Sequence, residues 1–242
     1  MPESIKPYQS SDRSKKEQVE QMFDTISKDY DGLNRVISFG IDLKWRKKVV
    51  KLVTDTQPKA ILDIATGTGD LIISLANSTA ERLVGLDLSD GMLEVGRKKI
   101  LAQKLDSRIQ MIQGDSEALP FDDNSFDAIT VAFGVRNFEN LENGLKEILR
   151  VLKPGGIFVV LETAVPTKTP YKQGYIVYSK YILPVIGRLL SKDPKAYKYL
   201  CESASIFPFG ETFNNILRKI GFIDVNNLPQ TFGAASIYTA SK

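Results

Sequence analysis

The sequence predicts a single α/β domain with a doubly wound, mostly parallel, seven-stranded sheet. Short β-rich runs alternate with helical patterns along the chain, the turns between them are short, and several runs end in an acid or a glycine. This alternation is typical of parallel sheets whose strands are joined by crossover helices. The length of 242 residues suits one such domain.

Two helices are predicted before the sheet. Residues 1–14 are polar and lack the apolar core of a signal peptide, so we expect a flexible tail there, and residues 15–242 form the domain. From about residue 15 to residue 34, apolar side chains recur at helical spacing and predict one helix. A second helix is expected over residues 42–53. The apolar face of the first helix consists of Val19, Met22, Phe23, Ile26 and Tyr30.

Strand-like runs fill much of the remaining chain. Helical patterns at residues 89–105 and 139–152 lie between them, and KPGG at 153–156 indicates a helix stop followed by a turn. After Glu162, which ends the fifth strand, residues from about 166 to 210 predict a helical cap over the carboxyl edge of the sheet. The predicted strands are residues 60–65, 82–87, 109–115, 126–133, 156–162, 222–228 and 235–240.

Composition excludes several kinds of site. The chain has no histidine, so proton transfer must use carboxylate, phenol, amine or water, and we expect no metal site. The single cysteine, Cys201, excludes an internal disulfide and fits a reducing cytoplasm. A net charge of +3 permits contact with anionic lipid but does not indicate nucleic acid. Because no apolar run approaches the ~20 residues that span a bilayer, we expect a soluble or peripheral protein.

The glycine loop DIATGTGD, residues 63–70, is of a kind that holds a dinucleotide or S-adenosylmethionine. A dinucleotide loop requires G-x-G-x-x-G. Gly67 and Gly69 supply the first pair, but Ile72 occupies the third position. The pyrophosphate interpretation therefore lacks its last glycine. No G-K-[ST] stretch occurs, so ATP is not expected.

Acids at three successive predicted strand ends favour S-adenosylmethionine. Asp63 precedes the loop, and Asp87 closes the second strand, where a carboxylate can accept from both ribose hydroxyls. Asp115 and Ser116 close the third strand, where they can contact an adenine edge. Such acids match an adenosine with a cationic amino-acid tail and repel a polyphosphate. The ordinary alternative for any one acid is a helix N-cap, for which Asp90 is better placed than Asp87.

Four stretches together resemble the class I, Rossmann-like S-adenosylmethionine-dependent methyltransferases, and more narrowly the ubiquinone/menaquinone biosynthesis C-methyltransferase family. Two signatures carry the narrower resemblance: YDGLNRVISFGIDLKW at 30–45 and RVLKPGGIFVVLETA at 150–164. Asp42 departs from the family pattern, which favours histidine there. The four stretches are DIATGTGD, GLDLSDGML, GDSEALPFDDNSFDAITVAFGVRN and RVLKPGG.

The resemblance implies contacts from Thr68, Asp87, Asp115 and Ser116 to the methyl donor. It also implies that FGVRN at 133–137 lines the reaction centre and that the cap covers a polyprenylated ring. The implied reaction is C-methylation of a polyprenyl quinol. Demethylmenaquinol is favoured over 2-polyprenyl-6-methoxy-1,4-benzoquinol, because the dual-specificity enzymes carry the histidine that this chain lacks.

Methyl transfer to a ring carbon requires an electron-rich ring, which a phenolate provides. Because a free phenol has a pKa of ~10, the site must favour the anion or remove its proton. We expect Arg136 and Asn137 to hold the phenolate oxygen, and water or a nearby carboxylate to receive the proton. An aromatic face of Tyr30 near the sulfonium would contribute ~0.5–2 kcal/mol, although Tyr30 also fits an ordinary core position.

Several alternatives stay open from the sequence. The stretch YIVYSKYILPVIGRLL suits a membrane-facing amphipathic role at the inner face of the membrane, but also internal helices or a homodimer seam. A related small-molecule methyltransferase would share every donor-binding residue, and a non-enzymatic module that senses the donor is a further alternative. A nucleic-acid methyltransferase is disfavoured, because [DN]-P-P-[YF] is absent and Cys201 lacks a preceding proline.

Overall fold

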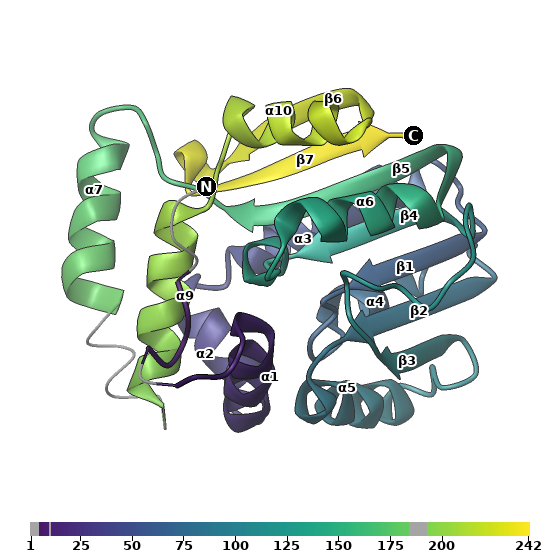
Figure 1. Ribbon diagram of the computed structural model, residues 1–242, viewed down its shortest axis with the longest axis horizontal. Coiled ribbons are helices and arrows are strands. Elements are labelled where there is room, and N and C mark those ends of the chain that lie inside the picture. The colour runs from purple at the N-terminus through teal and green to yellow at the C-terminus, as the bar shows by residue number, and fades with distance from the viewer. Residues whose placement is uncertain (1–4, 10, 184–192) are drawn as a thin grey trace.

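A computed structural model of the chain describes residues 5–9, 11–183 and 193–242, and it confirms the predicted α/β fold (Figure 1). In these residues seven strands form one sheet in the order β3-β2-β1-β4-β5-β7-β6. Strands β1 to β5 pair in parallel, whereas β7 runs antiparallel to both β5 and β6. The strands are β1 Ala60–Ile64, β2 Arg82–Asp87, β3 Ile109–Gln113, β4 Phe126–Ala132, β5 Leu152–Thr163, β6 Ile223–Gln230 and β7 Ala235–Ser241.

Helices cover both faces of this sheet. On one face, the buried side chains of Val49, Leu75 and Ile100 pack against the strands from α3, α4 and α5. On the other face, Leu145 and Leu217 pack from α6 and α10. The central strand β1 is buried along its whole length, as parallel strands between two helical layers are. These helices are α3 Asp42–Thr54, α4 Asp70–Leu75, α5 Asp90–Ala102, α6 Leu141–Val151 and α10 Glu211–Ile220.

A further group of helices lies beyond the carboxyl ends of the parallel strands, toward which the arrowheads of β1, β4 and β5 point in Figure 1. Met22 and Ile26 of α1, Met92 of α5, and Ala196 and Tyr199 of α9 form a separate buried cluster there. This placement brings an apolar layer over the sheet edge that carries the predicted site. The helices of the group are α1 Lys15–Ile26, α2 Tyr30–Ile37, α7 Tyr171–Val177, η2 Tyr178–Ile182 and α9 Pro194–Ile206.

The predicted tail and cap are described only in part. Residues 1–4 and 10 of the tail, and residues 184–192 of the cap, lie outside the described residues. In the rest of the tail, the hydroxyl of Tyr8 donates to Asp193 Oδ2 at 2.6 Å and its backbone N–H donates to Gln18 Oε1 at 2.8 Å. These bonds join the segment before α1 to α1 itself and to the N-cap of α9.

The predicted single helix over residues 15–34 is wrong, because α1 ends at Ile26 and α2 begins at Tyr30. The hydroxyl of Ser27 donates to the backbone oxygen of Asp24 at 3.0 Å, and Asp29 is the N-cap residue of α2. Short polar side chains that bond the nearby backbone favour such helix ends. The break places Tyr30 in the first turn of a new helix instead of near the end of the first.

The structure also tests two smaller predictions. Ser89, not Asp90, caps α5, because its hydroxyl accepts from the backbone N–H of Met92 at 3.1 Å. The KPGG stretch lies within the bounds of strand β5, although α6 does stop before it at Val151. The predicted turn is nevertheless present, because the register with β4 jumps from Leu152 to Ile157 and Gly155 has a φ angle of 76°.

Candidate active site

A cavity of about 720 Å³ lies between the carboxyl ends of the central strands and the helices α1 and α2. Its floor comes from the loops that follow β1, β2, β3 and β4, and side chains of α1 form part of its wall. The structure therefore brings together, around one cavity, predicted residues that come from distant parts of the chain. The predicted residues that line it are Tyr30, Gly67, Asp87, Asp115, Ser116 and Asn137.

Asp87 lies at the end of β2 and faces this cavity, with 9% of its surface exposed. Its Oδ2 accepts from the N–H of Gly67 at 2.7 Å, and its Oδ1 accepts from the N–H of Ser89 at 2.9 Å. Burial raises the pKa of the Asp87 carboxyl to about 6, although these backbone donors act in the opposite direction. Because a carboxylate has about four lone-pair sites, Asp87 can accept two further bonds from a diol.

Asp115 and Ser116 line the cavity beyond the end of β3. The Oδ1 of Asp115 accepts from the N–H of Glu117 at 2.9 Å. Its Oδ2 forms an ion pair with Lys16 Nζ at 2.5 Å. Lys16 belongs to α1, so this contact ties the first helix to the loop after the third strand.

The glycine loop crosses the carboxyl end of β1. Gly67 and Gly69 have φ angles of 59° and 80°, a left-handed conformation that glycine adopts without strain. Asp63 lies beneath the loop with 1% exposure and accepts from the hydroxyls of Thr66 at 2.6 Å and Thr130 at 2.5 Å. Burial raises the pKa of Asp63 to about 6, against the effect of these two bonds. Asp63 and Gly69 therefore shape the loop from behind the cavity wall.

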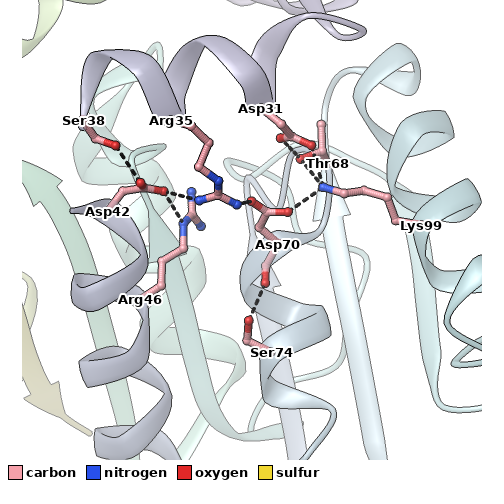
Figure 2. Close-up of polar contacts among 9 residues, drawn as sticks. All are labelled: Asp31, Arg35, Ser38, Asp42, Arg46, Thr68, Asp70, Ser74 and Lys99. Carbon is pink, nitrogen blue, oxygen red and sulfur yellow. Dashed lines mark hydrogen bonds and ion pairs between the residues drawn. The ribbon is translucent and has the colours of Figure 1, made fainter. Parts of the chain in front are cut away.

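Thr68 does not line the cavity, and its side chain joins a polar network that Figure 2 shows. Its hydroxyl donates to Asp31 Oδ1 at 2.6 Å and accepts from Lys99 Nζ at 3.1 Å. Lys99 Nζ also contacts Asp31 Oδ2 at 2.7 Å and Asp70 Oδ1 at 2.5 Å. Three acceptors thus match the three N–H donors of the ammonium group.

Arg35 extends this network from α2 toward α3 (Figure 2). Its guanidinium contacts Asp70 Oδ2 at 2.8 Å and Asp42 Oδ2 at 2.7 Å. The hydroxyl of Ser38 donates to Asp42 Oδ1 at 2.6 Å. The acid that replaces the family's usual histidine is thus a buried counter-ion. It lies among basic side chains and not in the cavity wall.

Tyr30 opens α2 next to Asp31, so the network fixes the part of the chain that carries it. Its ring meets the ring of Phe23 edge-on, with centroids 5.8 Å apart, and both side chains line the cavity. Burial raises the pKa of the Tyr30 phenol, which therefore stays neutral at physiological pH. The ring supplies an apolar, aromatic wall to the cavity.

Arg136 and Asn137 lie in the short helix η1, Val135–Asn137, after β4. Asn137 lines the cavity and its Oδ1 accepts from the Tyr199 hydroxyl at 3.2 Å. Arg136 lies behind the cavity wall, where it forms a 2.6 Å ion pair with Glu162 Oε1 and donates to the Phe133 backbone oxygen at 2.8 Å. The Arg136 and Glu162 side chains are 7% and 1% exposed. Arg136 Nε and Glu162 Oε2 are both buried without a hydrogen-bond partner.

Several residues of the site were not predicted from the sequence. Glu162 could have been suspected, because it closes the fifth strand as Asp87 closes the second. Lys16, Lys99 and Tyr199 carry no local signal, because each lies in a helix whose polar positions are mostly exposed. Their partners are distant along the chain, and only the folded structure brings them together.

Comparisons with known proteins cover nearly the whole chain. Residues 11–242 match the ubiE/COQ5 methyltransferase family. The chain is 48% identical over 241 residues to a demethylmenaquinone methyltransferase of Bacteroides fragilis, covering 99% of this chain and 98% of that protein. It is 44% identical over 230 residues to the ubiquinone/menaquinone biosynthesis C-methyltransferase UbiE of Geobacter sulfurreducens, covering 94% and 90% of the two chains.

Solved structures share the fold at low identity. The [4+2]-cyclase SpnF superimposes with a TM-score of 0.67 at 19% identity, covering 94% of this chain and 96% of that one. An S-adenosylmethionine-dependent methyltransferase of Thermotoga maritima gives a TM-score of 0.63 at 19% identity, covering 92% and 99%. These likenesses establish the class I methyltransferase fold. The family match and the near full-length relatives together place the chain in the ubiE/COQ5 methyltransferase family.

Proposed function

We propose that this protein transfers a methyl group from S-adenosylmethionine to a ring carbon of demethylmenaquinol, as a step of menaquinone biosynthesis. Family membership and the names of its relatives in Bacteroides fragilis and Porphyromonas gingivalis support the reaction. The observation that carries the proposal is the cavity in which Asp87, Asp115 and Asn137 meet. The relative in Geobacter sulfurreducens is named for both quinones, so the benzoquinol is the second candidate substrate.

The cavity fits the methyl donor. Its lining combines the apolar side chains of Phe23, Tyr30 and Phe133 with a few polar groups, as is usual for small-molecule sites. Asp87 faces it with capacity for the ribose diol, and Asp115 and Ser116 lie further along for the adenine. When bound, the donor supplies a methyl group on a positively charged sulfur. Tyr30 then provides an aromatic face for that charge.

We assign Asn137, which lines the cavity, to contact with the phenolate oxygen, and Arg136, which lies behind the wall, to the positive charge near that oxygen. Burial lowers the pKa of Arg136, but the adjacent Glu162 outweighs that effect, so the guanidinium stays charged. A donor aimed at a developing oxyanion contributes on the order of 3 kcal/mol to the transition state. We assign the released proton to water or to a carboxylate near the ring.

Other reactions on the same fold remain the alternative. A related small-molecule methyltransferase would use the same donor-binding residues, and SpnF is described as a cyclase although it shares the fold. A donor-sensing module without turnover is the non-enzymatic alternative. Asn137 beside the buried Arg136–Glu162 pair favours an enzyme, because a module that only binds the donor has no need of these residues.

We also propose that the protein contacts a membrane surface through an aromatic patch of Phe39, Tyr171, Tyr178, Tyr181 and Phe232. Phe39, Phe232 and Tyr181 are 71%, 68% and 61% exposed. Ring contacts join three separate segments, because Phe39 lies 6.0 Å from Tyr178 and Tyr171 stacks on Phe232 at 3.9 Å. None of the helices in residues 5–9, 11–183 and 193–242 has the length and apolar character needed to cross a bilayer.

Charge around the patch favours an anionic lipid surface. Residues 163–183 include Lys168, Lys172 and Lys180 and contain neither aspartate nor glutamate. Aromatic side chains with interspersed lysines bind at the headgroup level of such bilayers. Tyr175 of α7 is half-buried, and the positive charge of Arg136 opposes the rise that burial causes in the pKa of its phenol. The alternative to a membrane is a second copy of this protein, which would cover the patch in a homodimer.

Asp87 gives a pH-dependent prediction for donor binding. Because the ionised carboxylate accepts from the ribose and its pKa is about 6, the Kd for S-adenosylhomocysteine should rise about tenfold per pH unit below 6 and stay flat above 7. The raised pKa of Asp87 favours the folded state at low pH, so protonation of this group does not itself unfold the protein. Calorimetry should show that Asp87→Asn weakens binding about 10- to 100-fold and flattens the profile.

The matched control for this prediction is Asp90→Asn. Asp90 lies near Asp87 in sequence, but its side chain is 57% exposed and pairs with Arg97. This variant should bind as the native protein does. An unchanged pH profile in Asp87→Asn would assign the titration to Asp63 and contradict the role of Asp87.

The function itself is tested by supplying labelled S-adenosylmethionine with chemically reduced demethylmenaquinol and, separately, with the benzoquinol analogue. We expect labelled menaquinol and no product from the oxidised quinone.

Arg136→Lys keeps a charge opposite Glu162 but loses the guanidinium geometry, so its kcat should fall by about 10² while its Kd for S-adenosylhomocysteine stays within about threefold. No product from either quinol, despite tight donor binding, would support the sensing module instead.

Membrane contact is tested by co-sedimentation with vesicles. The native protein should sediment with vesicles that contain anionic lipid and less with purely zwitterionic ones. Phe39→Ser combined with Phe232→Ser should weaken sedimentation. Leu101→Ser is the control and should not, because Leu101 is also exposed (65%) but lies on α5. Concentration-dependent dimerisation that the double variant abolishes, without any lipid binding, would assign the patch to a homodimer.

A further inference from the structure

Arg46 is a largely buried cation whose Nε makes no hydrogen bond with the part of the chain that the structure describes. It lies on α3, its side chain is 13% exposed, and its Nε is buried without a hydrogen-bond partner. Its contact with an acid runs from Nε to Asp42 Oδ2 at 3.6 Å, which is an ion pair but too long for a hydrogen bond. Figure 2 shows the guanidinium beside that of Arg35, which holds Asp42 at 2.7 Å. Arg46 therefore has donors available for another acceptor.

The guanidinium of Arg46 lies close to the glycine-loop end of the cavity. Its carbon is 5.4 Å from the ring centroid of Phe133, which lines the cavity. Burial raises the pKa of Asp63 and of Tyr30, and the positive charge of Arg46 acts in the opposite direction on both. Tyr30 and Phe133 line the cavity, whereas Arg46 and Asp63 lie behind its lining residues. Arg46 thus supplies positive charge beside the part of the wall that Tyr30 and Phe133 form.

Four other cations near the cavity are already neutralised at short range, and a fifth, Lys15, donates to the backbone oxygen of Phe138 at 2.7 Å. Each of the four has a carboxylate oxygen within 2.8 Å. These four are Lys16, Arg35, Lys99 and Arg136. Arg46 differs from them because its nearest carboxylate oxygen is 3.6 Å away. A buried cation without hydrogen bonds is costly, so an additional carboxylate at this point would be stabilising.

We propose that Arg46 binds the carboxylate of the methionine part of the methyl donor. This assignment rests on the proposed function, in which S-adenosylmethionine occupies the cavity. A guanidinium matches a carboxylate with two parallel N–H···O bonds. Asp42 then balances the shared charge of Arg35 and Arg46 from the far side. With Asp87 at the ribose and Asp115 at the adenine, Arg46 completes charge and polarity matching along the length of the donor.

Two ligands separate this role from a general structural one. S-adenosylhomocysteine carries the amino-acid carboxylate, whereas 5′-methylthioadenosine retains the adenosine and lacks it. In calorimetry, Arg46→Met should raise the Kd for S-adenosylhomocysteine about 10- to 100-fold. The Kd for 5′-methylthioadenosine should stay within about twofold, because that ligand makes no contact with residue 46. The Kd of Arg46→Lys for S-adenosylhomocysteine should lie between those of the native protein and Arg46→Met, since lysine keeps the charge and loses the paired donors.

Lys47→Met is the matched control, because Lys47 is an exposed neighbour on the same helix and should leave both affinities unchanged. An equal loss for both ligands in Arg46→Met and Arg46→Lys would overturn the proposal and assign Arg46 to packing. Unchanged binding of S-adenosylhomocysteine would overturn it as well. If the native protein bound 5′-methylthioadenosine and S-adenosylhomocysteine equally, no carboxylate site would exist. If it bound neither, the proposed donor itself would be wrong.

Discussion

The network of alternating charges Asp31–Lys99–Asp70–Arg35–Asp42 is the interaction on which the site depends. Lys99 joins Asp31 of α2 to Asp70 of α4, and Arg35 joins Asp70 to Asp42 of α3. An isolated surface ion pair contributes only about 0–1 kcal/mol. Here each inner charge has two opposite neighbours, and most of the side chains are partly buried, so the pairs reinforce one another. This network of ion pairs fixes α2, and with it Tyr30, against the glycine loop.

The α/β core places the acids of the site, and the N-terminal helices α1 and α2 cover them. Parallel strands bring their carboxyl ends to one edge, which is why Asp63, Asp87 and Asp115 lie there. The core alone leaves that edge open, and α1 and α2 close it through polar contacts to its loops. Lys16 contacts the loop after β3, and Asp31 contacts the loop after β1. In the segment after β2, the Ser89 hydroxyl donates to Asp24 Oδ1 at 2.6 Å, and the Gly91 N–H donates to the same oxygen at 2.9 Å.

The same arrangement explains how much the sequence could predict. Strand–helix alternation and acids at strand ends are local patterns, so the sheet and the positions of Asp87 and Asp115 were predicted correctly. The end of α1 was missed because the apolar spacing continues to Tyr30 across the polar break at residues 27–29. Lys99, Arg46 and Glu162 depend on partners from other segments, and no periodicity in the sequence identifies such pairs. The departure at Asp42 was visible, but its role as a buried counter-ion to Arg35 was not.

The most direct test of this account is the affinity of Lys99→Met for S-adenosylhomocysteine, compared with that of Lys98→Met. Lys98 is adjacent on α5, but its side chain is 74% exposed and pairs only with Glu94 in the same helix. We predict that Lys99→Met binds about tenfold more weakly, because Asp31 and Asp70 lose their shared cation and α2 no longer holds Tyr30 over the cavity. Lys98→Met should bind as the native protein does. Equal affinity in both variants would contradict the account.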